Sequence, residues 1–163
     1  MKKIIMLCLA FVFATTLYAQ SAANLTDIVK AEKTKWQDLT YLVFFLDEAN
    51  AQDEELQNIT PEQAFDFFNE LGLIPSDVSA NTPLRYDYMA EFLVKSFNLP
   101  AKSILFLITG NRRYAYRQMQ QIGLYSVSTF PSDVPNGSSF VTILGQFSEM
   151  YPNLSLVHSA LHN

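Results

Sequence analysis

Hydrophobic residues recur with a helical period in five stretches of the chain, and polar segments containing Pro, Gly and Asn separate these stretches. A spacing of three to four residues places apolar side chains on one face of an α-helix, where they can pack into a core. The pattern predicts an all-α fold. The expected helices cover roughly residues 35–51, 61–71, 85–99, 112–122 and 140–151.

Local signals predict where some of these helices begin and end. Residues 60–63, Thr-Pro-Glu-Gln, form a capping box with proline in the first turn. Gly72 and Gly123 are expected to end the second and fourth helices in the left-handed conformation. The apolar run at 103–109 is either a short helix or a strand, and the lack of an evident pairing partner favours the helix.

The second and fourth helices echo each other at a constant distance of fifty-one residues. The matched positions share their chemistry and are Ala64/Ala115, Phe65/Tyr116, Phe68/Met119, Leu71/Ile122 and Gly72-Leu73/Gly123-Leu124. The third and fifth helices correspond at a spacing of fifty-two, as in Tyr88/Phe140 and Phe92/Leu144. A fixed period of this kind indicates a repeated supersecondary unit. We therefore expect two tandem helical-hairpin repeats, with cores at 60–99 and 112–151, plus an N-terminal half-repeat helix.

The N-terminus has the form of a secretory signal peptide. Lys2 and Lys3 precede an uncharged apolar stretch at 4–17, and Ala19 offers a small residue for cleavage. Cleavage near Ala22 is an alternative, and so is retention of the segment as a membrane anchor. Export to the periplasm or cell envelope is the expected outcome.

The remaining chain is long enough for one domain. We expect a signal peptide at 1–19, a single all-α repeat domain at 20–152 and a loosely held tail at 153–163. The one cysteine, Cys8, lies in the signal. The processed chain would therefore contain no disulfide, no thiol nucleophile and no cysteine metal ligand.

Charge narrows the range of partners. The net charge is −5, and removal of Lys2 and Lys3 with the signal lowers it to −7. An acidic surface disfavours nucleic acid and anionic lipid as partners, because both attract a cationic footprint. No second apolar stretch is long enough for a membrane span after signal cleavage.

The candidate ligand-binding or partner-binding residues are arginines with neighbouring tyrosine. Arg112, Arg113, Tyr116 and Arg117 form the densest cluster, and Arg85 precedes the third helix. Guanidinium groups hold carboxylates, phosphates or sugar acids, and aromatic faces stack beside such ligands. The alternative is a solvated, salt-bridged first helical turn.

Other patterns give weaker alternatives. Paired carboxylates such as Asp66/Glu70 suggest a glycan-processing hydrolase, but nothing in the sequence indicates the burial that separates two pKa values. His158 and His162 have metal-ligand spacing without an acidic partner. The aromatic helix around Trp36 is either core or an exposed ridge that binds a membrane protein, and core is favoured. We predict no enzyme, no metal and no cofactor.

Two segments resemble surface-layer-homology (SLH) repeats. The sequence at 83–99 is similar to the second half of the SLH motif, and 68–73 is similar to its first half, which ends in Gly-Leu or Gly-Ile. The run from Arg113 to Arg117 is also similar to a helix in exported envelope proteins of Treponema-like spirochaetes. In SLH domains a Thr-Arg-Ala-Glu stretch at the start of the second helix binds secondary cell-wall polymers; the matching residues here are 85–88, and 137–140 in the second copy.

The resemblance implies a non-catalytic scaffold. We expect an exported binding module for a cell-wall polymer or for an envelope protein partner.

Overall fold

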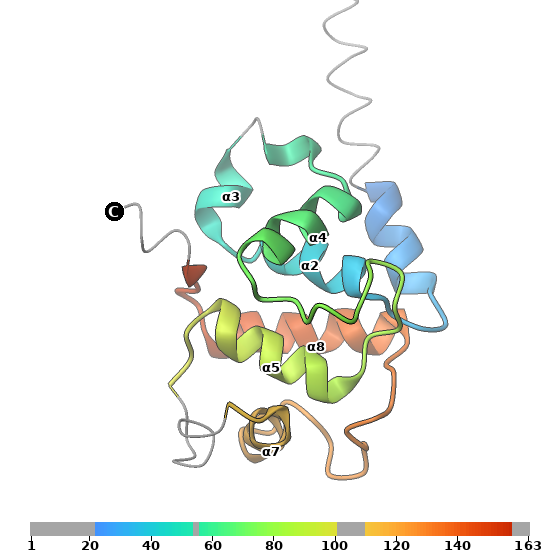
Figure 1. The fold of residues 1–163 in the computed structure, drawn as a ribbon, viewed down its shortest axis with the longest axis vertical. Coiled ribbons are helices and arrows are strands. Elements are labelled where there is room, and N and C mark those ends of the chain that lie inside the picture. Colours follow the sequence, from blue (N-terminus) through green and yellow to red (C-terminus); the bar gives the residue numbers. More distant parts are fainter. Residues whose placement is uncertain (1–21, 54–55, 101–109, 158–163) are drawn as a thin grey trace, which may run out of the picture.

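The computed structural model describes residues 22–53, 56–100 and 110–157, and these residues fold as an all-α domain (Figure 1). Residues 22–30 are helical. The elements that follow are α2 (Trp36–Phe44), α3 (Glu48–Gln52), the 3₁₀ turn η1 (Leu56–Asn58), α4 (Pro61–Glu70), α5 (Tyr86–Ser96), α7 (Arg112–Gln121) and α8 (Gly137–Met150). The described residues contain one isolated β-bridge, between Lys35 and Pro83, and no sheet. The predicted fold class is confirmed.

Loop carbonyls satisfy the first N–H groups of α2 and α5, whose N-cap residues make no side-chain cap bond. Trp36 N donates to Thr82 O at 3.1 Å, and Gln37 N donates to Ala80 O at 3.0 Å. The loop after α7 does the same for α5. Tyr86 N donates to Asp133 O, and Asp87 N donates to Pro131 O, both at 3.0 Å. Helix starts otherwise leave these donors unpaired, so each loop fixes the position of a helix distant in sequence.

The bonds that end and connect the helices recur with the predicted period. Gly72 (φ +69°) and Gly123 (φ +82°) are both left-handed, as expected. The bond from Leu73 N to Phe68 O, at 3.1 Å, recurs from Leu124 N to Met119 O at 2.9 Å. The N-caps of α5 and α8 are Arg85 and Asn136, which are also fifty-one residues apart. The spacing of fifty-two predicted for these two helices is therefore wrong by one residue, because that alignment matched aromatic residues instead of helix starts.

The starts of α2, α5 and α8 meet at one point. Leu84 N donates to Thr34 O at 2.9 Å, and Thr34 N donates to Pro135 O at 2.9 Å. All three residues are buried. Each lies two positions before the first residue of its helix, so the three helices start from a shared hydrogen-bonded centre.

The closest helix packing differs from the predicted hairpins. Among the described elements, α2 packs most extensively on α4, and α5 on α7. Figure 1 shows the α2–α4 pair above α5 and α8, with α7 below. The predicted pairing of α4 with α5 is looser, because a long loop at 71–85 separates them. The backbone pairs thus join a helix of one predicted unit to a helix of the next.

Aromatic rings connect the two helix pairs through the core. Phe68 of α4 meets Phe92 of α5 at a centroid distance of 5.0 Å, and Phe92 meets Trp36 of α2 at 5.7 Å. Ala64 and Ala115 are fully buried, as the repeat predicted. Trp36 is 1% exposed, so the prediction that the aromatic helix belongs to the core is confirmed.

Two predictions near the chain ends need correction. The helix predicted at 35–51 breaks after Phe44, and the Oδ2 atom of buried Asp47 accepts the backbone N–H of Leu156 at 2.9 Å. Leu156 is 2% exposed, so the first residues of the predicted loose tail are anchored. A hydrogen bond across 109 residues overrides the local helical pattern here.

The helix at 22–30 was not predicted. It packs against the start of α8, where Gly137 N donates to Ala31 O at 2.8 Å. A Cβ atom at position 137 would lie 1.7 Å from Ile28 O, so this contact requires glycine.

The predicted signal peptide at 1–19, the apolar run at 103–109 and His158 with His162 lie outside the described residues. Within the described part of the chain, no helix has both the length and the hydropathy of a membrane span.

Candidate ligand-binding groove

A groove of about 270 Å³ lies where α2, α5, α7 and the loop after α4 meet. Its walls combine aromatic side chains, backbone and charged groups. The lining residues are Trp36, Gly72, Leu73, Ile74, Pro75, Tyr88, Glu91, Phe92, Lys95 and Arg112. The groove thus includes Arg112 of the predicted arginine cluster.

The aromatic wall comes from helices that are far apart in sequence. Trp36 is the first residue of α2, and its ring meets Tyr88 of α5 edge-on at 5.8 Å. Tyr88 and Phe92 are four residues apart on α5, so both face the same side of that helix. Trp36 and Phe92 are each 1% exposed and form the buried base of this wall, so Tyr88 is the ring that a ligand can reach.

Two arginines from different elements share one buried carboxylate. Asp87 is in the first turn of α5, where a negative charge is favoured by the helix dipole, and it is 4% exposed. Its Oδ2 atom accepts a hydrogen bond from Arg85 Nη2 at 2.8 Å and forms an ion pair with Arg112 Nε at 3.2 Å. Its Oδ1 atom accepts the backbone N–H of Tyr88 at 3.0 Å. One carboxylate therefore orients two guanidinium groups and leaves one positive charge in excess.

Both guanidinium groups also lie over the ring of Tyr88, with Arg112 at 4.3 Å and Arg85 at 5.4 Å from the ring centre. Their side chains are 42% and 38% exposed, so donors that do not contact Asp87 remain within reach of a ligand. On the other side of the groove, Lys95 pairs with Glu91 at 2.6 Å.

Two buried donors near the groove have no hydrogen-bond partner in the described structure, Trp36 Nε1 and Arg85 Nε. Buried donors are normally satisfied by protein, water or ligand, so each can donate a hydrogen bond to an acceptor group of a bound ligand.

The predicted arginine cluster divides into two surfaces. Arg112 and Arg85 come together through Asp87, although 26 residues separate them. Arg113 and Arg117 are exposed on another side of α7. Tyr116 is 4% exposed, and its hydroxyl donates to Thr129 O, so it supports the following loop and presents no face to a ligand.

A second groove, of about 300 Å³, occupies the corresponding place between α8, the loop after α7 and the start of α5. Six of its lining residues follow residues of the first groove by fifty-one positions: Leu124, Tyr125, Ser126, Ser139, Thr142 and Ile143. Its lining carries hydroxyl groups and no charged side chain. Burial raises the pKa of Tyr125 far above its usual value and also raises the pKa of Tyr86, so both hydroxyls stay protonated. Of these two corresponding grooves, only the first is lined by cationic side chains.

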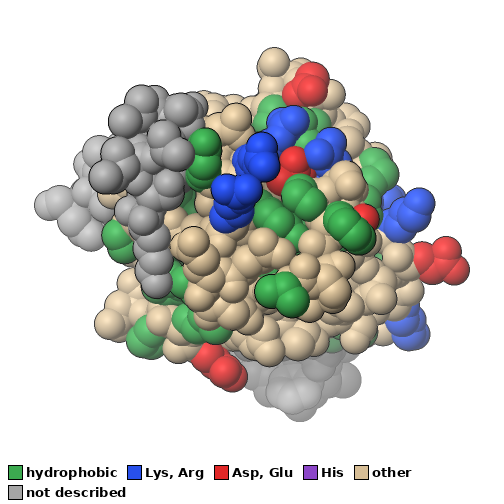
Figure 2. All heavy atoms as spheres, turned by 90° about the horizontal axis from the view of Figure 1, so that it is seen from below, with side chains coloured by type: hydrophobic (Ala, Val, Ile, Leu, Met, Phe, Trp, Pro, Cys, Tyr) green, Lys and Arg blue, Asp and Glu red, His purple; other side chains and the backbone are tan. Residues whose placement is uncertain are grey.

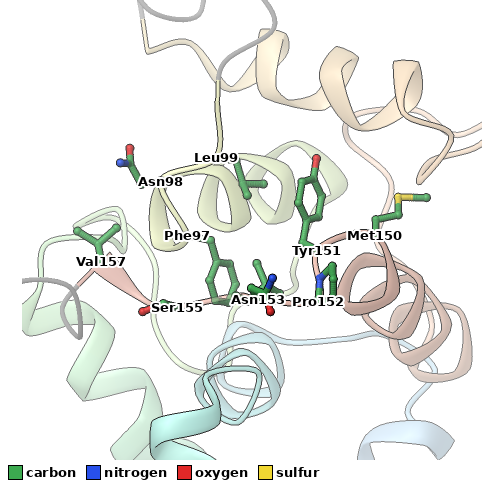
Figure 3. Close-up of a pocket in the computed structure, with 10 residues that line it drawn as sticks. Phe97, Asn98, Leu99, Met150, Tyr151, Pro152, Asn153, Ser155 and Val157 are labelled. Carbon is green, nitrogen blue, oxygen red and sulfur yellow. The ribbon is translucent and has the colours of Figure 1, made fainter.

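A larger cavity of about 510 Å³ lies at the C-terminal ends of α5 and α8 (Figure 3). Phe97 and Leu99 come from the end of α5, and Tyr151 and Val157 from the segment that follows α8. No residue that lines it is charged. This cavity therefore has no cationic side chain that could bind an acidic ligand.

Among the described carboxylates considered for hydrolysis, none is buried beside a second one. Asp66 and Glu70 are exposed on α4, and Asp47 is used by the backbone of Leu156. In the described part of the chain, no group of three or more His, Cys, Asp or Glu side chains is placed to hold a metal ion.

Comparison of the chain with protein families, with curated proteins and with solved structures found no significant match. The groove's chemistry therefore has to be argued from its own residues.

Proposed function

We propose that this chain is an exported, non-catalytic binding module of the cell envelope, and that its cationic groove captures an acidic cell-wall glycan. The observation that carries the proposal is the pair Arg85 and Arg112, held by Asp87 beside the aromatic wall of Trp36 and Tyr88. Guanidinium groups suit carboxylate or phosphate substituents, and the partly exposed ring of Tyr88 offers an apolar contact for a sugar ring.

The orientation of Arg85 and Arg112 by Asp87 supports a binding role for the two arginines over a purely structural one. The bonds to Asp87 reduce the ordering that two long side chains would otherwise undergo when a ligand arrives. The groove lining itself holds one arginine, one lysine and one glutamate, a positive balance in a chain of net charge −5. The recurring hairpin bonds also support a repeat scaffold, which suits a module that binds an extended polymer.

The matched test compares neighbouring arginines. Arg112→Gln and Arg113→Gln remove the same charge from the same helix, but only Arg112 lines the groove. We expect Arg112→Gln to weaken sedimentation with purified cell-wall polymer by roughly tenfold, the loss associated with one charge-assisted hydrogen bond, and Arg113→Gln to change it by less than about twofold.

Equal losses in both variants would show that capture depends on net charge alone and not on the groove. Breakdown of the polymer during the assay would contradict the non-catalytic part of the proposal. Export is tested separately by the mass of the secreted chain, which should lack residues 1–19 or a few more.

A further inference from the structure

Two loops of the chain share one hydrogen-bonded backbone but differ in what they expose. The loop after α7 presents Val127 (89% exposed) and Phe130 (67% exposed). Fifty-one residues earlier, in the loop after α4, the corresponding residues are Ser76 and Ser79, of which both are exposed. The loop after α4 therefore shows what the corresponding backbone looks like without the two exposed apolar side chains.

The shared backbone shows that the fold does not require these apolar side chains. Phe130 N donates to Asp133 Oδ2 at 3.1 Å, and Asp133 N donates to Phe130 O at 3.1 Å. In the earlier loop, Ser79 N donates to Thr82 Oγ1 at 2.9 Å, and Thr82 N donates to Ser79 O at 2.9 Å. A serine supports the same turn as Phe130, so packing within the loop does not explain the phenylalanine.

Helix α7 holds the exposed loop in a fixed position. Tyr116 donates its hydroxyl hydrogen to Thr129 O, and Gln120 Nε2 donates to Ser126 O at 3.2 Å. The backbone of Asp87 also donates to Pro131 O at 3.0 Å. The two apolar side chains are therefore presented by an ordered loop, which lowers the entropy lost on docking.

Two cations lie on the adjoining edge of α7. Arg113 comes three residues before Tyr116, and Arg117 comes three residues before Gln120, so each neighbours a side chain that holds the loop. Both are exposed, and no ion pair among the described residues involves either of them. Figure 2 views the molecule from the side of α7. It shows Lys and Arg side chains on this face, with isolated hydrophobic side chains near them. The nearest acidic group of the loop, Asp133, is exposed and accepts Phe130 N.

We propose that this face docks peripherally on an anionic phospholipid surface. Phe130 and Val127 enter the headgroup region, and Arg113 and Arg117 contact lipid phosphates. A bilayer surface has phosphate groups above an apolar region, so it can receive exposed apolar side chains and neighbouring cations together. Such binding needs no complementary pocket. The net charge of −7 after loss of Lys2 and Lys3 opposes such contact, but physiological salt screens charges beyond about 8 Å, so the local cations determine the interaction.

The test is flotation of the exported chain with vesicles of phosphatidylglycerol and phosphatidylethanolamine, compared with vesicles of phosphatidylcholine alone. Val127→Ser/Phe130→Ser installs the residues of the earlier loop, so the fold should be retained, as circular dichroism and the unfolding midpoint will show. We expect this variant to bind anionic vesicles at least ~10-fold more weakly than the wild type. Arg113→Gln/Arg117→Gln should lose the salt dependence of binding.

The control is Arg112→Gln, which removes one charge from α7 outside this face and should retain vesicle binding while it loses capture by the groove. Absence of wild-type binding to anionic vesicles, or binding that survives Val127→Ser/Phe130→Ser, would overturn the proposal. Self-association that the same double variant abolishes would assign the face to a second copy of the chain and would overturn it as well.

Discussion

Replacement of Asp87 by asparagine tests whether one carboxylate holds the groove together. Asn keeps an oxygen for the backbone N–H of Tyr88 but loses the charge that attracts Arg85 and Arg112. An ion pair with a partly exposed partner contributes about 0.2–1 kcal/mol after solvent screening. Both arginine side chains are more than one third exposed. The two pairs together then give an expected loss of about 0.4–2 kcal/mol in the free energy of unfolding.

Urea unfolding followed by tryptophan fluorescence measures this loss directly, because the chain contains a single tryptophan and its ring meets Tyr88. A double-mutant cycle isolates the contact. Asp87→Asn combined with Arg112→Gln should show a coupling energy of about 0.5–1 kcal/mol. Combined with Arg113→Gln, which has no contact with Asp87, the effects should add within about 0.3 kcal/mol.

The reasoning would be refuted by a loss below about 0.4 kcal/mol together with no coupling to Arg112, since both pairs would then contribute nothing measurable. Equal coupling to Arg112 and Arg113 would contradict it in another way, because it would indicate a diffuse field in place of a specific contact.

Further predictions concern the helix ends and the pH dependence of stability. Gly72→Ala and Gly123→Ala should each destabilise the fold by about 1 kcal/mol in urea unfolding, because both glycines are left-handed. A Cβ atom at either position meets nothing within 4 Å, so no steric clash adds to this backbone cost. Equal stability of glycine and alanine would contradict the backbone argument. Burial raises the pKa of Asp38 above 3.8, against the lowering effects of the Lys35 backbone N–H and charge. Because the pKa of Asp38 is raised in the folded state, its protonated form stabilises the fold fully below pH 3.8, and this stabilisation is lost as pH rises through the folded pKa. Asp38→Asn should therefore remove this fall in the thermal unfolding midpoint. A variant with the same pH profile as the wild type would refute this prediction.

Helix ends with local signals were predictable from the sequence, and ends set by distant contacts were not. The capping box at Thr60 and the left-handed Gly72 are encoded within a few residues, and the structure confirms both. The break after Phe44 is different, because Asp47 bonds to the backbone of Leu156, which local periodicity cannot reveal. The helix at 22–30 was missed for a related reason, since its contact is with Gly137 of α8.

The candidate site shows the same division. The abundance of arginine at 112–117 is visible in the sequence, but its separation into two surfaces depends on which residues face Asp87. Asp87 and Tyr88 received no binding role from the sequence, although the SLH-like alignment placed them in the segment at 85–88. A signal existed in the period: alignment of the helix starts at Arg85 and Asn136 would have placed the loops in register.

The period also explains how one backbone can carry different chemistry. The loop after α4 contributes serines where the loop after α7 contributes Val127 and Phe130. The groove beside α5 contains Arg112 and Lys95, whereas the groove beside α8 is lined by hydroxyl groups. In both cases the hydrogen bonds that define the backbone come from main-chain atoms and small polar side chains, so exposed positions can vary without disturbing them. Differences between corresponding positions are therefore the most direct indicators of function in this chain, because the fold itself does not account for them.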